Sequence, residues 1–127
     1  GSFGRTVKIW DPCAGACRRT LSGHTKEVNS VAFSSDNQLL ASGSDDTTVK
    51  IWDPCSGACL RTLSGHTKDV NSVGFSSDNK LLASGSDDTT VKIWDPRSGA
   101  CLRTLSGHTD CVRSVAFSSD NQLLASC

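Results

Sequence analysis

The sequence predicts an all-β protein built from repeated four-stranded antiparallel sheets, and two observations support this fold class. First, Val7, Val49 and Val91 recur at a spacing of 42 residues, and residues 44–85 and 86–127 share 35 identities in 42 positions. Second, apolar residues within each repeat alternate over short stretches bounded by turn residues, which is typical of strands and not of helices. A fixed period of this length indicates a unit that stacks on its neighbours.

Each repeat contains four such stretches, which in the first complete repeat are VNSVAFS, QLLASG, TVKIWD and ACLRTLS. The segments SDN, SDD, PCSG and GHTK separate them, and Asp36 and Asn37 are residues that tight hairpins favour. Four short antiparallel strands in a repeating unit predict one blade of a β-propeller. Because the repeats fill the sequence, we expect residues 1–127 to form a single domain with three blades' worth of strands per chain.

Composition and charge exclude several classes of partner. The chain has 127 residues, 36% apolar and 20% charged, as expected of a globular domain. Thirteen basic and thirteen acidic residues cancel and are spread through every repeat, so we expect neither nucleic acid nor an anionic membrane as a partner. No apolar stretch approaches the roughly 20 residues of a membrane span, and we expect no signal segment.

The seven cysteines, an odd number, argue against a closed disulfide framework and favour an intracellular, cytoplasmic location. Cys13 and Cys17 form a C-x3-C pair, as do Cys55 and Cys59, but one pair supplies only two of the four ligands of a structural zinc site. The third repeat has Arg97 at the position of Cys55. We therefore expect no metal and no cofactor.

The stretch GHTKEVNSVAFSSDNQLLASGSDDTTVKIWD, with GH, a gap and then WD, resembles the WD-repeat family of β-propellers. The resemblance covers all 127 residues and the motif recurs three times. It implies a ring of blades and a function as a protein-interaction scaffold. Three blades are too few for a ring, since about four is the minimum.

The resemblance also implies a buried, hydrogen-bonded tetrad in each repeat. Its members would be His24, Ser42, Asp46 and Trp52, then His66, Ser84, Asp88 and Trp94, and in the split repeat His108, Ser126 and Trp10, with Gly4 at the place of the aspartate. Ser, His and Asp are also the residues of a hydrolase triad. A catalytic serine is expected once, in a cleft, and not beside a Trp in every repeat, so we expect no enzyme and no catalytic residue.

The order of the expected strands predicts self-assembly. If a, b, c and d denote the strands after each GH, the chain runs c-d, a-b-c-d, a-b-c-d, a-b. Strands c and d of one copy would complete a and b of another, which gives head-to-tail association. We expect a ring-shaped homo-oligomer, a nine-bladed homotrimer in preference to a six-bladed dimer.

The b–c and d–a connections of such a meander lie on one face, where WD-repeat proteins usually bind their partners. The residues expected there are Glu27, Asn29, Asp45, Asp69, Asn71, Asp87, Cys111, Arg113 and, from a neighbouring copy, Phe3. A face rich in carboxylates suits a basic peptide. The alternative is a natural or engineered propeller fragment that only assembles and has no ligand. Cys111 and Cys127 are expected near one another, where oxidation could link them.

Overall fold

The computed structural model describes residues 4–10, 17–118, 120 and 124–126, and it confirms the all-β class. Twelve strands make up its regular structure, and every pairing between them is antiparallel. Among the described residues no helix is present that could cross a membrane. The four-stranded antiparallel sheets are those expected of propeller blades.

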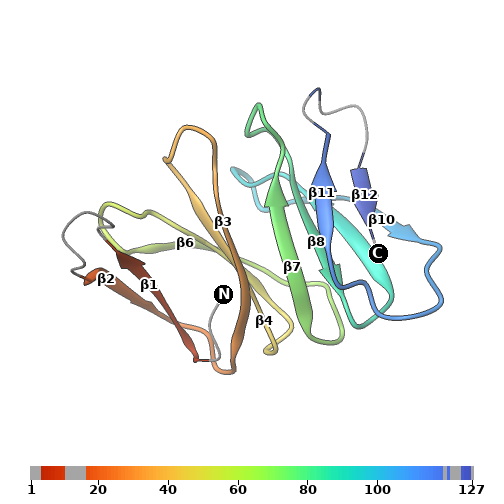
Figure 1. The fold of residues 1–127 in the computed structure, drawn as a ribbon, viewed down its shortest axis with the longest axis horizontal. Coiled ribbons are helices and arrows are strands. Elements are labelled where there is room, and N and C mark those ends of the chain that lie inside the picture. Colours follow the sequence, from red (N-terminus) through yellow and green to blue (C-terminus); the bar gives the residue numbers. More distant parts are fainter. Residues whose placement is uncertain (1–3, 11–16, 119, 121–123, 127) are drawn as a thin grey trace.

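The strands form two complete blades between two half-blades (Figure 1). The first half-blade contains β1 (Thr6–Trp10) and β2 (Cys17–Ser22). The first blade contains β3 (Val28–Phe33), β4 (Leu40–Ser44), β5 (Val49–Trp52) and β6 (Cys59–Leu63). The second blade contains β7 (Val70–Phe75), β8 (Leu82–Ser86), β9 (Thr90–Trp94) and β10 (Cys101–Ser106), and the second half-blade contains β11 (Val115–Phe117) and β12 (Leu124–Ser126).

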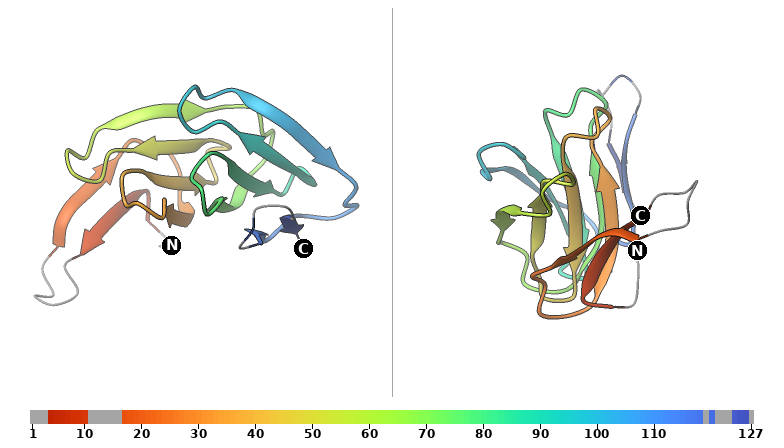
Figure 2. Two further views of the ribbon diagram at one scale, coloured as in Figure 1. Left: turned by 90° about the horizontal axis from the view of Figure 1, so that it is seen from above. Right: turned by 90° about the vertical axis from the view of Figure 1, so that its left-hand side faces the viewer.

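The sheets follow one another in a curved row (Figure 2), and the core lies between them. Val7 and Leu21 of the first half-blade pack with Val28, Leu40 and Trp52 of the first blade. A second cluster joins the first blade to the second, and a third joins the second blade to Val112 and Val115. Each blade therefore stabilises its neighbours, as expected of a repeat protein.

The turns explain why the strands end where they do. Asn37, at φ 59°, and Asn79, at φ 62°, take the left-handed conformation in the hairpins that join the first two strands of each blade. Asparagine tolerates this conformation better than most residues. Gly57 and Gly99, at φ 79° and 81°, serve the hairpins between the last two strands, where a residue with a side chain would be strained.

Gly43 allows the two blades to approach closely. A Cβ atom at this position would lie only 2.7 Å from Cγ1 of Val70 and 3.2 Å from Cγ1 of Val73. The same arrangement recurs at Gly85, where a Cβ would lie 2.6 Å from Cγ1 of Val112. The spacing between neighbouring blades thus depends on a glycine in the second strand of each blade.

Candidate functional site

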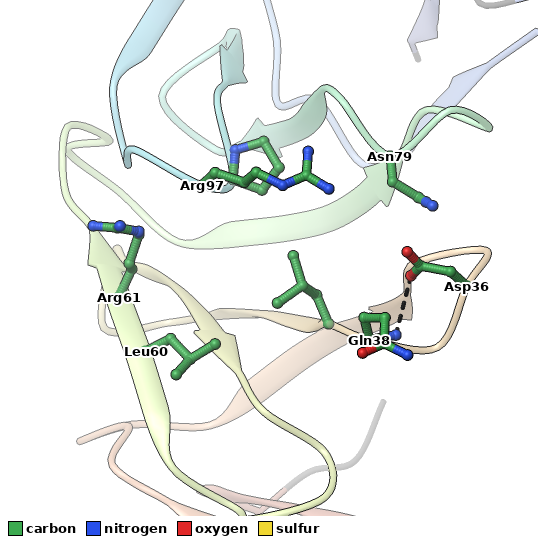
Figure 3. Close-up of a pocket in the computed structure, with 8 residues that line it drawn as sticks. Asp36, Gln38, Leu60, Arg61, Asn79 and Arg97 are labelled. Atoms are coloured by element: carbon green, nitrogen blue, oxygen red, sulfur yellow. Dashed lines mark hydrogen bonds between the residues drawn. The ribbon is translucent and has the colours of Figure 1, made fainter.

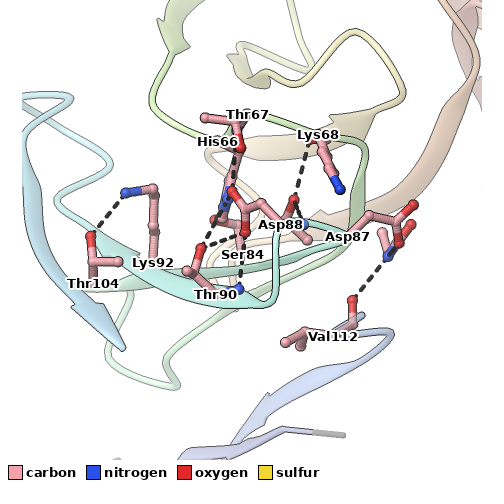
Figure 4. A network of polar contacts seen from close by, with 12 residues as sticks. His66, Thr67, Lys68, Ser84, Asp87, Asp88, Thr90, Lys92, Thr104 and Val112 are labelled. Atoms are coloured by element: carbon pink, nitrogen blue, oxygen red, sulfur yellow. Dashed lines mark hydrogen bonds and ion pairs between the residues drawn. The ribbon is translucent and has the colours of Figure 1, made fainter. Parts of the chain in front are cut away.

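A buried series of polar side chains joins each blade to the loop that precedes it, and Figure 4 shows part of the series in the second blade. In the second blade, Trp94 Nε1 donates to Ser84 Oγ at 2.8 Å, and Ser84 Oγ lies 2.7 Å from His66 Nε2. The other imidazole nitrogen, Nδ1, lies 2.8 Å from Asp88 Oδ2. Strands β8 and β9 supply the serine and the tryptophan, the turn between them supplies the aspartate, and the loop before β7 supplies the histidine.

The first blade has the same geometry. Trp52 Nε1 donates to Ser42 Oγ at 2.8 Å, Ser42 Oγ lies 2.6 Å from His24 Nε2, and His24 Nδ1 lies 2.8 Å from Asp46 Oδ2. The structure thus brings together the four residues that the resemblance implied for each complete repeat.

The hydrogen bonds around these histidines suit a neutral imidazole. The indole N–H donates to the serine oxygen, the serine O–H can donate to Nε2, and Nδ1–H can donate to the carboxylate. In this arrangement the imidazole is protonated at Nδ1 alone. Burial lowers the pKa of His24 and of His66, although Asp46 and Asp88 act in the opposite direction. Burial and hydrogen-bond order therefore favour the same neutral form.

The aspartate of the tetrad is held in its charged form. Burial alone would raise the pKa of Asp46, but hydrogen bonds from the Thr48 side chain, from His24 and from the Thr48 and Thr25 amides outweigh burial and lower it to about 2. Asp88 has the equivalent partners, and its pKa is also lowered. Each carboxylate therefore remains ionised at neutral pH and ties the loop to the turn.

The Ser–His–Asp geometry matches that of a hydrolase triad, but the environment does not suit a nucleophile. Ser42 and Ser84 are completely buried. The oxygen of each lies between an indole N–H donor and an imidazole, so it is both enclosed and already hydrogen-bonded. A substrate carbonyl could reach it only if the tetrad opened, so this geometry supports a structural role.

The third set of tetrad positions is only partly described. His108 is half-buried, whereas His24 and His66 are buried. Ser126 belongs to β12 and Trp10 to β1, and their side chains lie outside the described part of the chain. Gly4 stands at the aspartate position, and its carbonyl accepts a hydrogen bond from Val28 N at 2.8 Å.

The residues expected on the binding face form a network that links one blade to the next. Asn29 Nδ2 donates to Asp45 Oδ1 at 2.6 Å and to the carbonyl of Val70, in the next blade, at 3.0 Å. Asn71 makes the same two bonds, to Asp87 and to the carbonyl of Val112, at the same distances. The two asparagines therefore hold neighbouring blades together as well as lining this face. The sequence did not predict this link between blades.

Carboxylates from two blades meet on this face. Burial raises the pKa of Asp69, and the neighbouring carboxylates of Asp45 and Asp87 raise it further, with Lys26 acting in the opposite direction. Glu27 contributes its backbone carbonyl, which accepts from Asp45 N at 2.9 Å and from Ser44 Oγ at 2.7 Å. We refer to Glu27, Asn29, Asp45, Asp69, Asn71 and Asp87 together as the acidic face.

The third repeat contributes different groups at the equivalent positions. Cys111 Sγ donates to the backbone carbonyl oxygen of Asp87 at 3.9 Å. Hydrogen bonding with the Asp87 side chain is the main cause that raises the pKa of the thiol, and burial and the charge of Asp87 add to it. Arg113 is exposed and takes the place of the asparagine. Phe3 and Cys127 lie outside the described residues, so the closeness of Cys111 and Cys127 stays a prediction.

Several side chains that the sequence did not single out support these sites. Ser44 Oγ accepts from Asp46 N at 3.1 Å, and Thr48 Oγ1 donates to Asp46 Oδ1 at 2.6 Å. At the opposite end of the strands, Asn79 Oδ1 accepts from Ser35 N at 2.8 Å and thereby joins the two blades. The repeats are nearly identical over their whole length, so recurrence alone could not distinguish these residues from their neighbours.

Cys55, Cys59, Cys101 and Cys111 are free thiols. Within the described part of the chain, no cluster of three or more His, Cys, Asp or Glu residues could hold a metal ion.

Comparison with known proteins identifies the repeat. The family model described as "WD domain, G-beta repeat" matches residues 15–53, 57–95 and 99–127. Vegetative incompatibility protein HET-E-1 of Podospora anserina is 59% identical over 41 residues, which are 32% of this chain and 3% of that protein.

Two further relatives are matched over segments of similar length. Nuclear distribution protein PAC1 of Mycosarcoma maydis is 43% identical over 42 residues, 33% of this chain and 9% of PAC1. Small ribosomal subunit protein RACK1y of Oryza sativa subsp. japonica is 46% identical over 46 residues, 36% of this chain and 14% of RACK1y. The matched segments are thus small parts of these relatives and are similar in the repeat itself.

Proposed function

Because the chain belongs to the WD40 family of repeat proteins, we propose that it is a non-catalytic scaffold that binds a peptide or protein on its acidic face. The observation that carries this proposal is the approach of Asp69 to Asp45 and Asp87, which gathers carboxylates from two blades on one surface. A basic peptide segment is the partner that relieves this repulsion. A cytoplasmic location, inferred from the cysteines, remains a prediction.

Titration with an N-acetylated, C-amidated Gly-Arg-Gly-Lys-Gly peptide tests the acidic face. Asp69→Asn removes one charge there, and we expect it to weaken binding about two- to fivefold, as for an exposed ion pair. The matched control is Asp53→Asn, which makes the same charge change in a hairpin at the other end of the strands. The asparagine oxygen can still accept the hydrogen bond from Cys55 N, so the hairpin is kept. Equal losses in both variants, or no binding by the parent chain, would contradict this proposal.

A second proposal is that the chain assembles head to tail with itself. The last strand of a blade is covered by the following blade within the chain, but in the third repeat the equivalent leucine is exposed. Leu21 and Leu63 are 1% and 2% exposed, whereas Leu105, at the same position of the repeat, is 43% exposed. Half-burial of a leucine side chain leaves on the order of 1 kcal/mol of hydrophobic stabilisation unrealised. A further blade packed against β10 would recover it.

The glycines of the GH motifs suggest what would pack there. A Cβ at Gly23 would lie 3.1 Å from the indole of Trp52, and one at Gly65 would lie 3.3 Å from the indole of Trp94. A Cβ at Gly107 would meet no described atom within 4 Å. The 42-residue period places Trp10 of a second copy at the equivalent position. Its strand β1 would also complete the second half-blade.

The angle between blades does not determine the number of copies in the ring. Two chains would make six blades of about 60° and three would make nine of about 40°, against about 51° in a seven-bladed ring. Both angles differ from the seven-bladed value by about 10°, so they do not decide between the homotrimer that we expect and a dimer. Light scattering at micromolar concentration distinguishes the two, and a monomeric mass would overturn self-assembly altogether.

Paired leucine variants test the proposed interface. Leu105→Ser should shift the population towards monomer. Leu102→Ser should not, because Leu102 is 52% exposed and its counterpart Leu60, which lies between two blades, is still 50% exposed. Trp10→Ala should weaken assembly in the same way, whereas Asp45→Ala on the acidic face should leave it intact. Equal effects of the two leucine variants would show that β10 is not the interface.

A further inference from the structure

A groove lies between the two blades, at the end of the strands opposite the acidic face (Figure 3). Its volume is about 430 Å³. The hairpin between β3 and β4 contributes Asp36, strand β6 contributes Leu60 and Arg61, and the hairpin between β9 and β10 contributes Pro96 and Arg97. The groove is therefore assembled from both blades of a single chain and does not depend on a second copy.

Two guanidinium groups border this groove. Arg97 extends across it towards Asn79 and Asp36, and Arg61 lies at its other edge (Figure 3). The stem of Arg61 is held in place, since a Cβ atom at Gly99 would lie 3.5 Å from its Cδ. The backbone at Arg97 is also fixed, because its N–H donates to Asp95 Oδ1 at 2.9 Å. Both arginines therefore border the same groove, Arg61 through its packed stem and Arg97 through its fixed backbone.

Part of the groove lining is apolar. Leu39 and Pro96 form part of it, and Leu60 has half of its side chain in contact with solvent. Asp36 stands at the far end, where its Oδ1 accepts hydrogen bonds from Ser34 Oγ at 2.6 Å and from Gln38 N at 3.0 Å. The groove therefore has Arg61 at one edge, Asp36 at the other and the Arg97 side chain reaching between them, beside an apolar surface.

We propose that this groove binds an acidic peptide segment, with one carboxylate on Arg97, an adjacent apolar side chain on Leu60, and Arg61 adding positive charge at the outer edge. Charge complementarity selects the partner, because the lining residues carry two positive charges and one negative charge. Guanidinium groups bind carboxylates in a fixed, directional geometry. The carboxylate of Asp36 sets the polarity of the segment, since it repels a second acid and accepts a peptide N–H at that end.

The chain contains a second groove that has no counterpart of Arg97 and, by the 42-residue period, Arg18 in place of Leu60. It lies between the first half-blade and the first blade, has a volume of about 450 Å³ and is lined by Arg19, Phe33 and Cys55 among others. Arg19 corresponds to Arg61 in the 42-residue period, but Cys55 takes the place of Arg97. We therefore expect the acidic segment to occupy the Arg97 groove in preference to the Cys55 groove.

The test uses the full chain under reducing conditions and an N-acetylated, C-amidated Gly-Glu-Leu-Glu-Gly peptide, followed by amide chemical shifts. We expect the shifts to centre on residues 36–39, 60–61 and 96–97 and the affinity to fall as salt is added. Arg97→Cys, which copies the neighbouring groove, should weaken binding about five- to tenfold, as for the loss of one charged hydrogen bond. Cys55→Ser, the control, should leave the affinity unchanged.

Three outcomes would overturn the proposal. The first is equal binding of the neutral Gly-Gln-Leu-Gln-Gly peptide, the second is unchanged affinity in Arg97→Cys, and the third is a set of shifts outside the groove. Arg97 is exposed, and a circular dichroism spectrum identical to that of the parent shows that this variant is folded. The basic peptide used for the acidic face is a different probe, so either site can fail without the other.

Discussion

Gly43→Ala should destabilise the protein although alanine is normally the better residue in a strand. The new Cβ would lie 2.7 Å from Cγ1 of Val70 and 3.2 Å from Cγ1 of Val73, and both valines are buried. Overpacking of this kind costs about 1–3 kcal/mol. Replacing glycine by alanine also lowers the conformational entropy of the unfolded chain, which stabilises the folded state by about 0.4–1 kcal/mol. The expected net effect is a destabilisation of about 1–2 kcal/mol.

Gly74→Ala is the matched control and should have the opposite sign. Its Cβ would meet only the carbonyl oxygen of Val115, at 3.7 Å, which is an ordinary contact. The other repeats have Ala32 and Ala116 at this position. Because no clash opposes the lower entropy of the unfolded chain, we expect Gly74→Ala to stabilise the protein by about 0.4–1 kcal/mol.

Urea unfolding followed by tryptophan fluorescence measures both variants. They should be compared with the parent at one protein concentration, because assembly would make the midpoint depend on concentration. Unchanged m-values would assign the differences to stability and not to a change in compactness. If Gly43→Ala stabilises the chain as much as Gly74→Ala, the close approach of the blades at this glycine is wrong.

Three further predictions concern the tetrad and the cysteines. His66→Ala or Trp94→Phe should cost about 1–3 kcal/mol, because each leaves buried partners unpaired; mutation-sensitive hydrolysis of an ester by the parent chain would refute the structural role. The free energy of unfolding should fall as pH drops below about 6.5. Burial lowers the pKa of His66 in the native state, so the unfolded chain binds a proton that the folded chain does not. A flat profile from pH 7 to 5 would contradict this. If Cys111 and Cys127 are linked by oxidation, thiol titration of air-exposed, denatured protein should count fewer than seven sulfhydryls.

The sequence predicted the strands closely because each is short, alternating and bounded by turn residues. The stretch VNSVAFS becomes β3 (Val28–Phe33), and ACLRTLS becomes β6 (Cys59–Leu63). The alternation extends one residue beyond the strand in VNSVAFS, because Ser34 leaves the ladder to start the hairpin. Its N–H donates to the carbonyl of Leu39 at 2.9 Å, and its Oγ donates to Asp36.

The contacts between blades could not be predicted in the same way. Asn29 was expected to face a ligand, but its amide is bonded to Asp45 and to the Val70 carbonyl. A polar residue at the end of a strand can serve either purpose, and only the position of the next blade decides between them. The second-strand glycine depends on tertiary structure in the same way, because the sequence does not show that Val70 lies against Gly43.

Strand length shows how far a strand depends on the strand beside it. The segments Val70–Phe75 and 112–117 differ only by Asn71 against Arg113 and Gly74 against Ala116, yet β7 spans the whole first segment and β11 only Val115–Phe117. Alanine is no worse in a strand than glycine, so local propensity does not explain the difference. The strand beside each segment explains it. Val70 and Ser72 pair with Ser86 and Gly85 of β8, whereas Val115 pairs with Ser126, where the described part of β12 ends. The assigned length of a strand is therefore set by its hydrogen-bonding partner as well as by its own residues, and a sequence pattern read one strand at a time does not contain that information.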